Sequence, residues 1–368
     1  MYKVLFTSDY EIHGSGMGSP HDLVVEPTTR MLDLFDRYGA RLTIMADAGE
    51  MLKFKQWADT HSHDRFHWWA MADQLRRAAR TGHDVQLHIH SSYFNAVWDD
   101  TNGRWVQDWS EYDLASLSYD RVRTMIRAGK QLLEETCRSA RPDYECFAFR
   151  AANWSMNPSR EIVRALLDEG FRIDTSVYKH GRYEDLVRFD YSRAHSDLVP
   201  WPIDERDVCR RDPRGKLFEF PIYAERRPIW VFATANRFYR VIAQRMNPLP
   251  TSGLPAPARS MSKNMRRGLL GTASMLLRKH PWKMDFNQCT GKQLVEGLKR
   301  VERRYGHPEV PLPFVLIGHP KTFTKHNERV LRPFLEYVAQ RPDRYAFATF
   351  ADVDPERYRF LQRDALAH

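Results

Sequence analysis

Short runs of β-branched and aromatic residues alternate with helix-like patterns along the first half of this 368-residue chain. Residues 2–8 are typical of a strand, residues 27–39 of a helix ended by Gly39, and residues 41–45 of a second strand. Strands that alternate with helices form βα units, in which the strands lie parallel. The chain is therefore predicted to be an α/β protein with a parallel sheet.

The same alternation continues towards the C-terminus. Further strands are predicted at residues 85–89, 146–149, 171–174, 217–223, 314–317 and 345–349. Further helices are predicted at residues 71–80, 119–137, 158–169, 292–305 and 328–340. Hydrophobic residues make up 42% of the chain and charged residues 28%, which is the balance of a folded globular protein and not of a disordered one.

The alternation breaks between residues 230 and 310. A proline-rich stretch at 248–257 is followed by a basic segment at 259–283. Strand-like runs return after this region, so we predict an insertion and not a separate domain. The insertion, 230–310, is expected to be Pro-rich and then basic and mostly helical, within one domain formed by 1–229 and 311–368.

The basic segment 259–283 contains seven Lys and Arg residues and no Asp or Glu, so it carries much of the net charge of +9. Leu and Met residues interleave with the cations, as in a helix that lies on an anionic membrane surface. A solvated face or a protein interface is the other interpretation, and the sequence leaves both open. No recognised reading motif accompanies the charge, so we expect no nucleic-acid partner.

The sequence favours a cytoplasmic location, at most peripheral to the inner face of the membrane. The apolar run at the N-terminus lasts only a few residues before Asp9, too short for a secretory signal. No run of about 18 uncharged apolar residues is present to span a bilayer. The four cysteines are widely spaced and too few for a disulfide framework, which fits a reducing compartment.

Asp9 and Glu11 follow the first predicted strand at i, i+2 spacing. Side chains alternate between the two faces of a strand, so both carboxylates point the same way. The C-terminal ends of parallel strands form the rim at which sites occur in α/β sheets and barrels. The alternative is a strand end whose acids face water.

His88 and His90 repeat this spacing near the end of the strand predicted at 85–89. Two imidazoles that point one way from a buried strand suit a divalent cation such as Zn²⁺, and Glu11 is the candidate for a third ligand. Three protein ligands leave a position open for water. The alternative is a pair of polar residues on a half-buried strand.

Five sequence motifs resemble those of the polysaccharide deacetylase family, also called the NodB-homology family or carbohydrate esterase family four. In chain order they are Thr7-Ser8-Asp9-Tyr10-Glu11, Gly82 to His90, Phe149-Arg150, Asp174-Thr175-Ser176 and Leu316 to Pro320. The resemblance spans nearly the whole chain apart from the insertion. It implies a distorted (β/α)7-type barrel, a divalent metal, most simply Zn²⁺, and hydrolysis of a non-peptide C–N bond.

The resemblance also implies roles for single residues. Asp9 matches the general base, and Arg150 matches the arginine that orients this base. Asp174 matches the acid that orients and charges the catalytic histidine, and His319 matches the general acid that protonates the departing amine. Glu11, His88 and His90 remain the candidate metal ligands. Candidate substrate-binding residues are Tyr10, Asn153 and Trp154.

Two departures from the family pattern leave assignments open. The usual first motif has adjacent aspartates, whereas Tyr10 stands in the second place here and Glu11 in the third, so the base and ligand roles of Asp9 and Glu11 can be exchanged. The usual second motif is His-x-x-x-His, which from His88 leads to Ser92. We select the nearby His90 as the ligand.

The implied reaction is removal of an N-acyl group, most simply N-acetyl, from an amino sugar of a surface polysaccharide or its lipid-linked precursor. The alternatives are hydrolysis of another non-peptide amide or of an O-acetyl ester, and a carbohydrate-binding relative without activity. Histidines 61, 63 and 67 are interpreted as a solvated loop. Tryptophans 68, 69, 98, 105 and 109 fit either a sugar-stacking wall or core packing.

Overall fold

The computed structural model describes the chain except for residues 13, 15, 235, 239–277 and 362–368. The proline-rich stretch and most of the basic segment 259–283 lie outside the described residues. The predicted insertion and domain boundaries therefore stay predictions.

Among the described residues, seven parallel strands form a ring at the centre of the protein. They are β1 (Tyr2–Tyr10), β2 (Leu42–Asp47), β3 (Asp84–Ile89), β6 (Ala148–Ala151), β7 (Ile173–Asp174), β12 (Phe218–Glu219) and β15 (Leu312–Gly318). Neighbours pair in this order, and β15 pairs with β1. A parallel bridge between Ile222 and Val315 closes the ring on the other side. The predicted distorted (β/α)7-type barrel is confirmed.

The remaining strands extend the ring or form small two-stranded sheets. β16 (Tyr345–Phe347) pairs with the first half of β1, and antiparallel strands β10 (Trp201–Asp204) and β11 (Asp207–Arg211) continue from β12. Among the described residues, three separate two-stranded antiparallel sheets are β4 (Val97–Asp99) with β5 (Arg104–Val106), β8 (Arg182–Glu184) with β9 (Arg188–Asp190), and β13 (Ala224–Pro228) with β14 (Lys279–Lys283).

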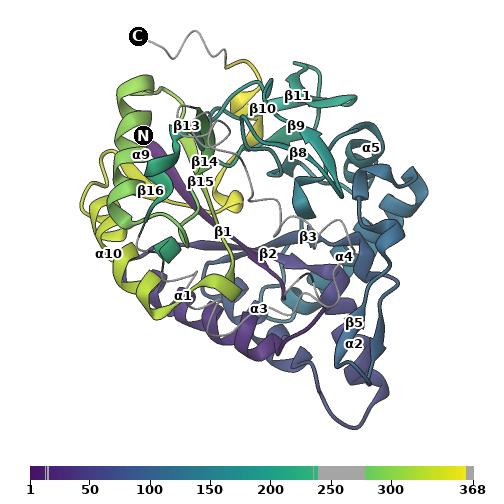
Figure 1. Ribbon diagram of the computed structural model, residues 1–368. Helices are drawn as coiled ribbons and strands as arrows, with labels where there is room; N and C mark the ends of the chain where they lie inside the picture. Colours follow the sequence, from purple (N-terminus) through teal and green to yellow (C-terminus); the bar gives the residue numbers. More distant parts are fainter. Residues whose placement is uncertain (13, 15, 235, 239–277, 362–368) are drawn as a thin grey trace, which may run out of the picture.

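Helices surround the ring and cover its outer side (Figure 1). They are α1 (Glu26–Asp36), α2 (Ala48–Thr60), α3 (Trp68–Arg80), α4 (Tyr119–Arg138), α5 (Arg160–Asp168), α9 (Gly291–Tyr305) and α10 (Lys325–Ala339). Short helical turns are η1 (His21–Val25), η2 (Ser91–Tyr93), η3 (Trp109–Glu111), η4 (Leu114–Ser116), η5 (Ala152–Trp154), η6 (Ile229–Phe232), η7 (Pro320–Thr322), η8 (Phe350–Asp352) and η9 (Pro355–Tyr358). Of the seven long helices in the part of the chain that the structure describes, the sequence predicted six and missed α2, whose start is marked by Asp47 accepting a hydrogen bond from the Gly49 amide.

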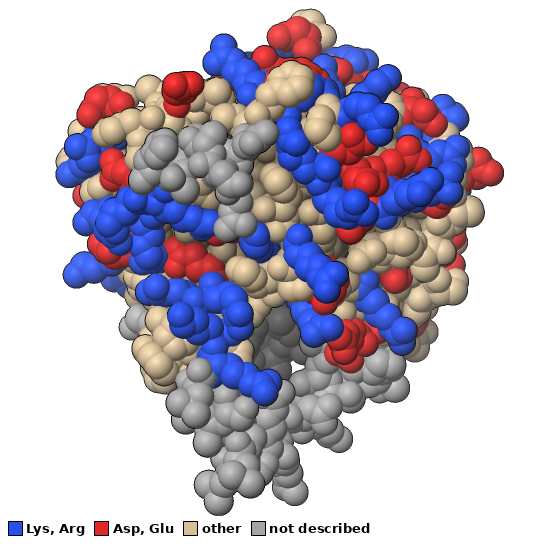
Figure 2. Space-filling view, turned by 90° about the horizontal axis from the view of Figure 1, so that it is seen from above, with Lys and Arg blue, Asp and Glu red and all other residues tan. Residues whose placement is uncertain are grey.

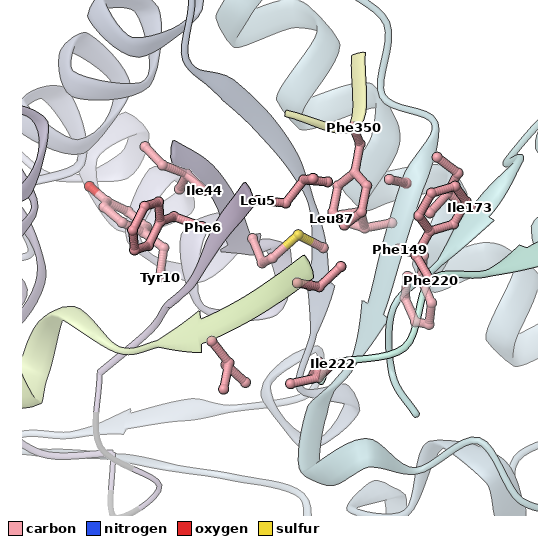
Figure 3. Close-up of a cluster of buried hydrophobic side chains, with 14 of the residues drawn as sticks. Leu5, Phe6, Tyr10, Ile44, Leu87, Phe149, Ile173, Phe220, Ile222 and Phe350 are labelled. Carbon is pink, nitrogen blue, oxygen red and sulfur yellow. The ribbon is translucent and has the colours of Figure 1, made fainter. Parts of the chain in front are cut away.

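Alternate residues of β1 face opposite sides of the ring wall. Phe6 lies 4.6 Å from the Phe35 ring of α1, measured between ring centroids, and the Tyr10 hydroxyl donates to Gln74 of α3 at 2.9 Å. Leu5 lies on the other side of the strand from Phe6 and Tyr10 (Figure 3). The interpretation of Tyr10 as a substrate-binding residue is therefore wrong, because its side chain is buried under a helix.

The C-terminal ends of adjacent strands carry buried charged residues. They are Asp9 in β1, Asp47 in β2, His88 in β3, Arg150 in β6 and Asp174 in β7. All seven strands of the ring run parallel, so these ends meet at one rim.

The surface agrees with the basic composition. On the face shown in Figure 2, Lys and Arg side chains are more prominent than Asp and Glu. None of the described helices is long and apolar enough to cross a membrane.

Asp84 begins β3, at the end of the barrel opposite that rim. One carboxylate oxygen accepts hydrogen bonds from the Val85 amide at 3.0 Å and from Gln86 Nε2 at 2.9 Å. The other oxygen is buried and has no hydrogen-bond partner among the described residues. Burial raises the pKa of Asp84 to about 7.

Asp84→Asn is expected to stabilise the protein at pH 8 by about 1–4 kcal/mol. A carboxyl group whose pKa is raised on folding costs stability once the pH exceeds its unfolded value, 3.8. The difference in free energy of unfolding between the variant and the wild type should grow from pH 4 to about 7 and then stay constant. Urea unfolding of both proteins across this range checks it, and a difference independent of pH would contradict it.

Candidate active site

Glu11, His88 and His90 form a compact group of possible metal ligands at the rim. One ligand atom from each residue lies within 4.8 Å of the others. Glu11 Oε2 is 3.0 Å from His88 Nε2 and 3.3 Å from His90 Nδ1. The structure thus brings the three predicted metal ligands together, from the end of β1 and the end of β3.

The hydrogen bonds of His88 suit a cation. Its Nδ1 lies 2.9 Å from the backbone carbonyl oxygen of Arg150, which can only accept, so Nδ1 carries the proton. In the neutral imidazole Nε2 then presents a lone pair towards the carboxylate oxygen of Glu11. Two acceptors at this separation need a proton or a metal ion between them. A carboxylate and two imidazoles are a donor set that Zn²⁺ takes.

Lys321 neutralises the other oxygen of Glu11. Its ammonium lies 2.6 Å from Glu11 Oε1 and also donates to the Ile12 carbonyl at 2.8 Å. Burial alone would raise the pKa of Glu11, but Lys321, His90 and His88 outweigh it and hold this pKa well below its usual value. Glu11 is therefore ionised, with Oε2 facing the imidazoles. The sequence did not indicate Lys321, which follows His319 by two residues.

Asp47 positions His90 and was not predicted. Its Oδ2 lies 2.7 Å from His90 Nδ1, and its Oδ1 accepts hydrogen bonds from the amides of His90 and Gly49. This is also the ring nitrogen that faces Glu11, so Asp47 holds His90 through the candidate ligand atom and not through the opposite nitrogen. Asp47 stands at the C-terminal end of β2. Its position at a strand end is therefore the same sequence signal that identified Asp9.

Asp9 lies between Arg150 and His319. Arg150 Nη1 is 2.6 Å from Asp9 Oδ1, and His319 Nε2 is 3.5 Å from Asp9 Oδ2. Burial would raise the pKa of Asp9, but the positive charge of Arg150 and the imidazoles of His88 and His319 outweigh this effect. The pKa of Asp9 therefore lies below its usual value. Arg150 is fully buried and pairs with Asp9, the contact that the family resemblance implies.

Asn287 holds the backbone of His319 from both sides. Its Oδ1 accepts from the His319 amide at 2.7 Å, and its Nδ2 donates to the His319 carbonyl at 3.2 Å. Burial lowers the pKa of His319, although Asp9 and Glu11 act against this. The imidazole is therefore neutral at pH 7.

Asp174 contacts different residues from those predicted. It accepts a hydrogen bond from Ser176 Oγ at 2.6 Å, and its other partner is Glu219, with which it shares a hydrogen bond. Burial and the Asp174 charge raise the pKa of Glu219 well above its usual value, so Glu219 is the protonated member of the pair. His319 is positioned by Asn287 instead, and the expected contact between Asp174 and His319 is corrected accordingly.

Asn153 and Trp154 lie just beyond the end of β6. Both have left-handed backbone conformations, with φ of 52° and 55°, which residues other than glycine adopt rarely. Asn153 Oδ1 accepts from the Tyr112 hydroxyl at 3.2 Å. The two residues therefore stand at the rim, and their role in substrate binding stays a prediction.

The other histidines and tryptophans that the sequence singled out lie elsewhere. His61 stacks on Trp57 with 3.8 Å between ring centroids. Trp68 and Trp105 are buried, and Trp98 packs on Trp105 with their ring centroids 5.6 Å apart. Core packing is thus the outcome for Trp68 and Trp105.

Comparisons with known proteins place the fold. No family model and no curated protein matches the sequence. Among solved structures, the chain is similar to a Mycobacterium smegmatis protein assigned as a polysaccharide deacetylase, with 15% identity, a TM-score of 0.50, and coverage of 97% of this chain and 90% of that chain. This chain has the polysaccharide deacetylase fold.

Two further solved structures are similar to this chain at lower TM-scores. A 4-alpha-glucanotransferase from Thermococcus litoralis has 12% identity and a TM-score of 0.49. The match covers 96% of this chain and 40% of the glucanotransferase chain. A polysaccharide deacetylase from Bacillus cereus has 9% identity and a TM-score of 0.39, and it covers 96% and 93%. Identities this low establish a fold alone, so the roles of single residues rest on the geometry above.

His88→Ala is expected to abolish stoichiometric binding of Zn²⁺, because it removes one of three ligands. Metal content after dialysis against Zn²⁺ checks this, with His61→Ala as the matched control that keeps its metal. Charges of nearby acids raise the pKa values of His88 and His90 despite burial, so wild-type affinity should fall as the pH drops below 7. Equal metal content in both variants would refute the assignment.

Gly318→Ala is expected to destabilise the protein by about 1–3 kcal/mol through overpacking. A Cβ at this position would lie 2.2 Å from Phe286 Cζ and 2.5 Å from Asn287 Oδ1, the atom that holds His319. Urea unfolding measures the loss, and Gly14→Ala, where a Cβ meets nothing within 4 Å, is the control. Equal stability of the two variants would show that the site yields to the extra methyl group.

Proposed function

We propose that this protein is a metal-dependent hydrolase that removes an N-acyl group, most simply N-acetyl, from an amino sugar. The observation that carries the proposal is the group of Glu11, His88 and His90 beside Asp9 and His319 at the rim of a polysaccharide deacetylase barrel. Parallel α/β barrels place their reaction centres at this rim. We propose that this amino sugar belongs to a surface polysaccharide or its lipid-linked precursor, and that the acyl group is removed in the cytoplasm.

A divalent cation held by Glu11, His88 and His90 would supply Lewis acidity, polarising the acyl carbonyl and activating a water molecule. Glu11 is assigned as the ligand and not the base, because its Oε2 faces both imidazoles. Asp9 is the base, because it lies outside that group and its Oδ2 is directed to His319.

The contacts of Asp9 indicate how protons move during the reaction. Arg150 keeps Asp9 ionised and oriented, so Asp9 can accept a proton from the attacking water as the C–O bond forms. His319 is neutral at rest and lies 3.5 Å from Asp9 Oδ2, so it can take up this proton. His319 then protonates the nitrogen as the C–N bond breaks. The products are a carboxylic acid and a free amine.

Asp9→Asn is expected to lower kcat for acetate release from N-acetylated amino-sugar oligomers by about 10²–10⁴-fold, with metal content unchanged. The amide keeps the shape of the carboxylate but cannot accept the proton. Asp22→Asn, at an exposed carboxylate, is the matched control and should keep wild-type kcat.

The same assay decides between reaction classes. O-acetylated sugars and small non-peptide amides are offered to the Zn²⁺-loaded wild type beside the N-acetylated oligomers. Faster turnover of an ester or of a small amide would move the proposal to that class. Absence of turnover with all of them would leave a carbohydrate-binding protein and sink the proposed activity.

A further inference from the structure

Lys283, at the end of β14, places its ammonium against two aromatic rings of the rim. Nζ is 3.4 Å from the centroid of Trp154 and 4.4 Å from that of Tyr178. The two rings are themselves edge to face, 5.3 Å apart. Three segments far apart in the chain thus form one cationic and aromatic group, which we call the Lys283 subsite.

The ammonium of Lys283 lacks a close anionic partner. Among the described residues, no carboxylate forms an ion pair with it, whereas Lys321 has Glu11 at 2.6 Å. Contact with aromatic faces contributes about 0.5–2 kcal/mol, less than the cost of removing an ammonium from water. Burial lowers the pKa of Lys283 to about 8, with Asp285 and Asp9 acting against it, so the group is still charged at pH 7.

The Lys283 subsite borders the reaction centre. The charges of Asp9 and Arg150 both act on the Lys283 ammonium, so it lies near these two rim residues. Two residues after Lys283, Asp285 pairs with Ile317 of β15, and His319 follows that strand. A sugar whose acyl nitrogen lies near His319 would bring a neighbouring substituent to Lys283.

The aromatic side of the subsite is held by strained backbone. Trp154 keeps its left-handed conformation because its carbonyl accepts a hydrogen bond from the Tyr191 hydroxyl and from the Met156 amide. A fold maintains such conformations where the position of a side chain matters. Here the conformation presents the half-buried Trp154 ring to Lys283.

We propose that the Lys283 subsite binds a carboxylate on the sugar, so that the substrate is an acidic, uronate-type acylated amino sugar. The substrate part of this inference rests on the proposed hydrolase function, whereas carboxylate binding does not. One ammonium balances the single negative charge of a carboxylate. A phosphate dianion needs more donors than this one lysine supplies. The rings of Trp154 and Tyr178 give the sugar an apolar wall.

The test compares binding of two oligosaccharides of equal length by calorimetry at pH 7. One contains uronate units, and in the other the same carboxyl groups are reduced to alcohols; neither carries an acyl group, so hydrolysis plays no part. The variants are Lys283→Met, which keeps the apolar stem, and Lys279→Met, which removes an exposed lysine from the same strand. A sugar phosphate is titrated as the third ligand.

We expect wild type and Lys279→Met to bind the uronate roughly 10–100-fold more tightly than the reduced sugar, the size of one charge-assisted contact. Lys283→Met should lose this preference and keep its affinity for the reduced sugar. Equal binding of both sugars by the wild type, an unchanged preference in Lys283→Met, or tighter binding of the sugar phosphate would each overturn the proposal. If the wild type prefers the uronate but shows no turnover in the acyl-release assay described above, the subsite is upheld and the enzyme function is refuted.

Discussion

The buried guanidinium of Arg150 joins the strands on which the site depends. It donates to Asp9 of β1 at 2.6 Å, to Thr7 Oγ1 of the same strand at 2.8 Å and to the Thr175 carbonyl beyond β7 at 3.0 Å. Its own backbone carbonyl accepts the Nδ1 proton of His88 in β3. A fully buried cation requires such partners, since an unpaired one would cost several kcal/mol. The same contacts therefore hold the barrel together at this level and orient both the base and a metal ligand.

The rim contains a group of paired charges and, beside it, one lysine without an ion pair among the described residues. Around Glu11 and Asp9, each carboxylate has a cationic partner, Lys321 for the first and Arg150 for the second. These pairs keep both acids ionised in spite of burial, which is what a metal ligand and a proton acceptor need. Lys283 lies beyond them with aromatic contacts and no ion pair among the described residues. Positive charge is thus left over beside the aromatic rings of Trp154 and Tyr178.

Strand periodicity explains both a success and an error of the sequence interpretation. Because side chains alternate, Asp9 and Glu11 share the inner face of β1, as predicted. The same alternation places Tyr10 on the outer face, where it bonds Gln74. The information that excludes Tyr10 from the site was therefore present in the sequence. Asp47 is a similar case, since it ends β2 at the same rim as the residues that were chosen.

The sequence by itself determined the parallel α/β sheet, the rim that carries the chemistry and the triad of Glu11, His88 and His90, whereas the barrel was implied by the family resemblance. The sheet, the rim and the triad depend on periodicity and on strand ends, which are local properties of the chain. Only the tertiary structure decided that Asp174 pairs with Glu219, that Asn287 holds His319, and that Lys283 meets Trp154. Each of these contacts joins segments that are brought together by closure of the ring, and no local pattern specifies which side chains then meet.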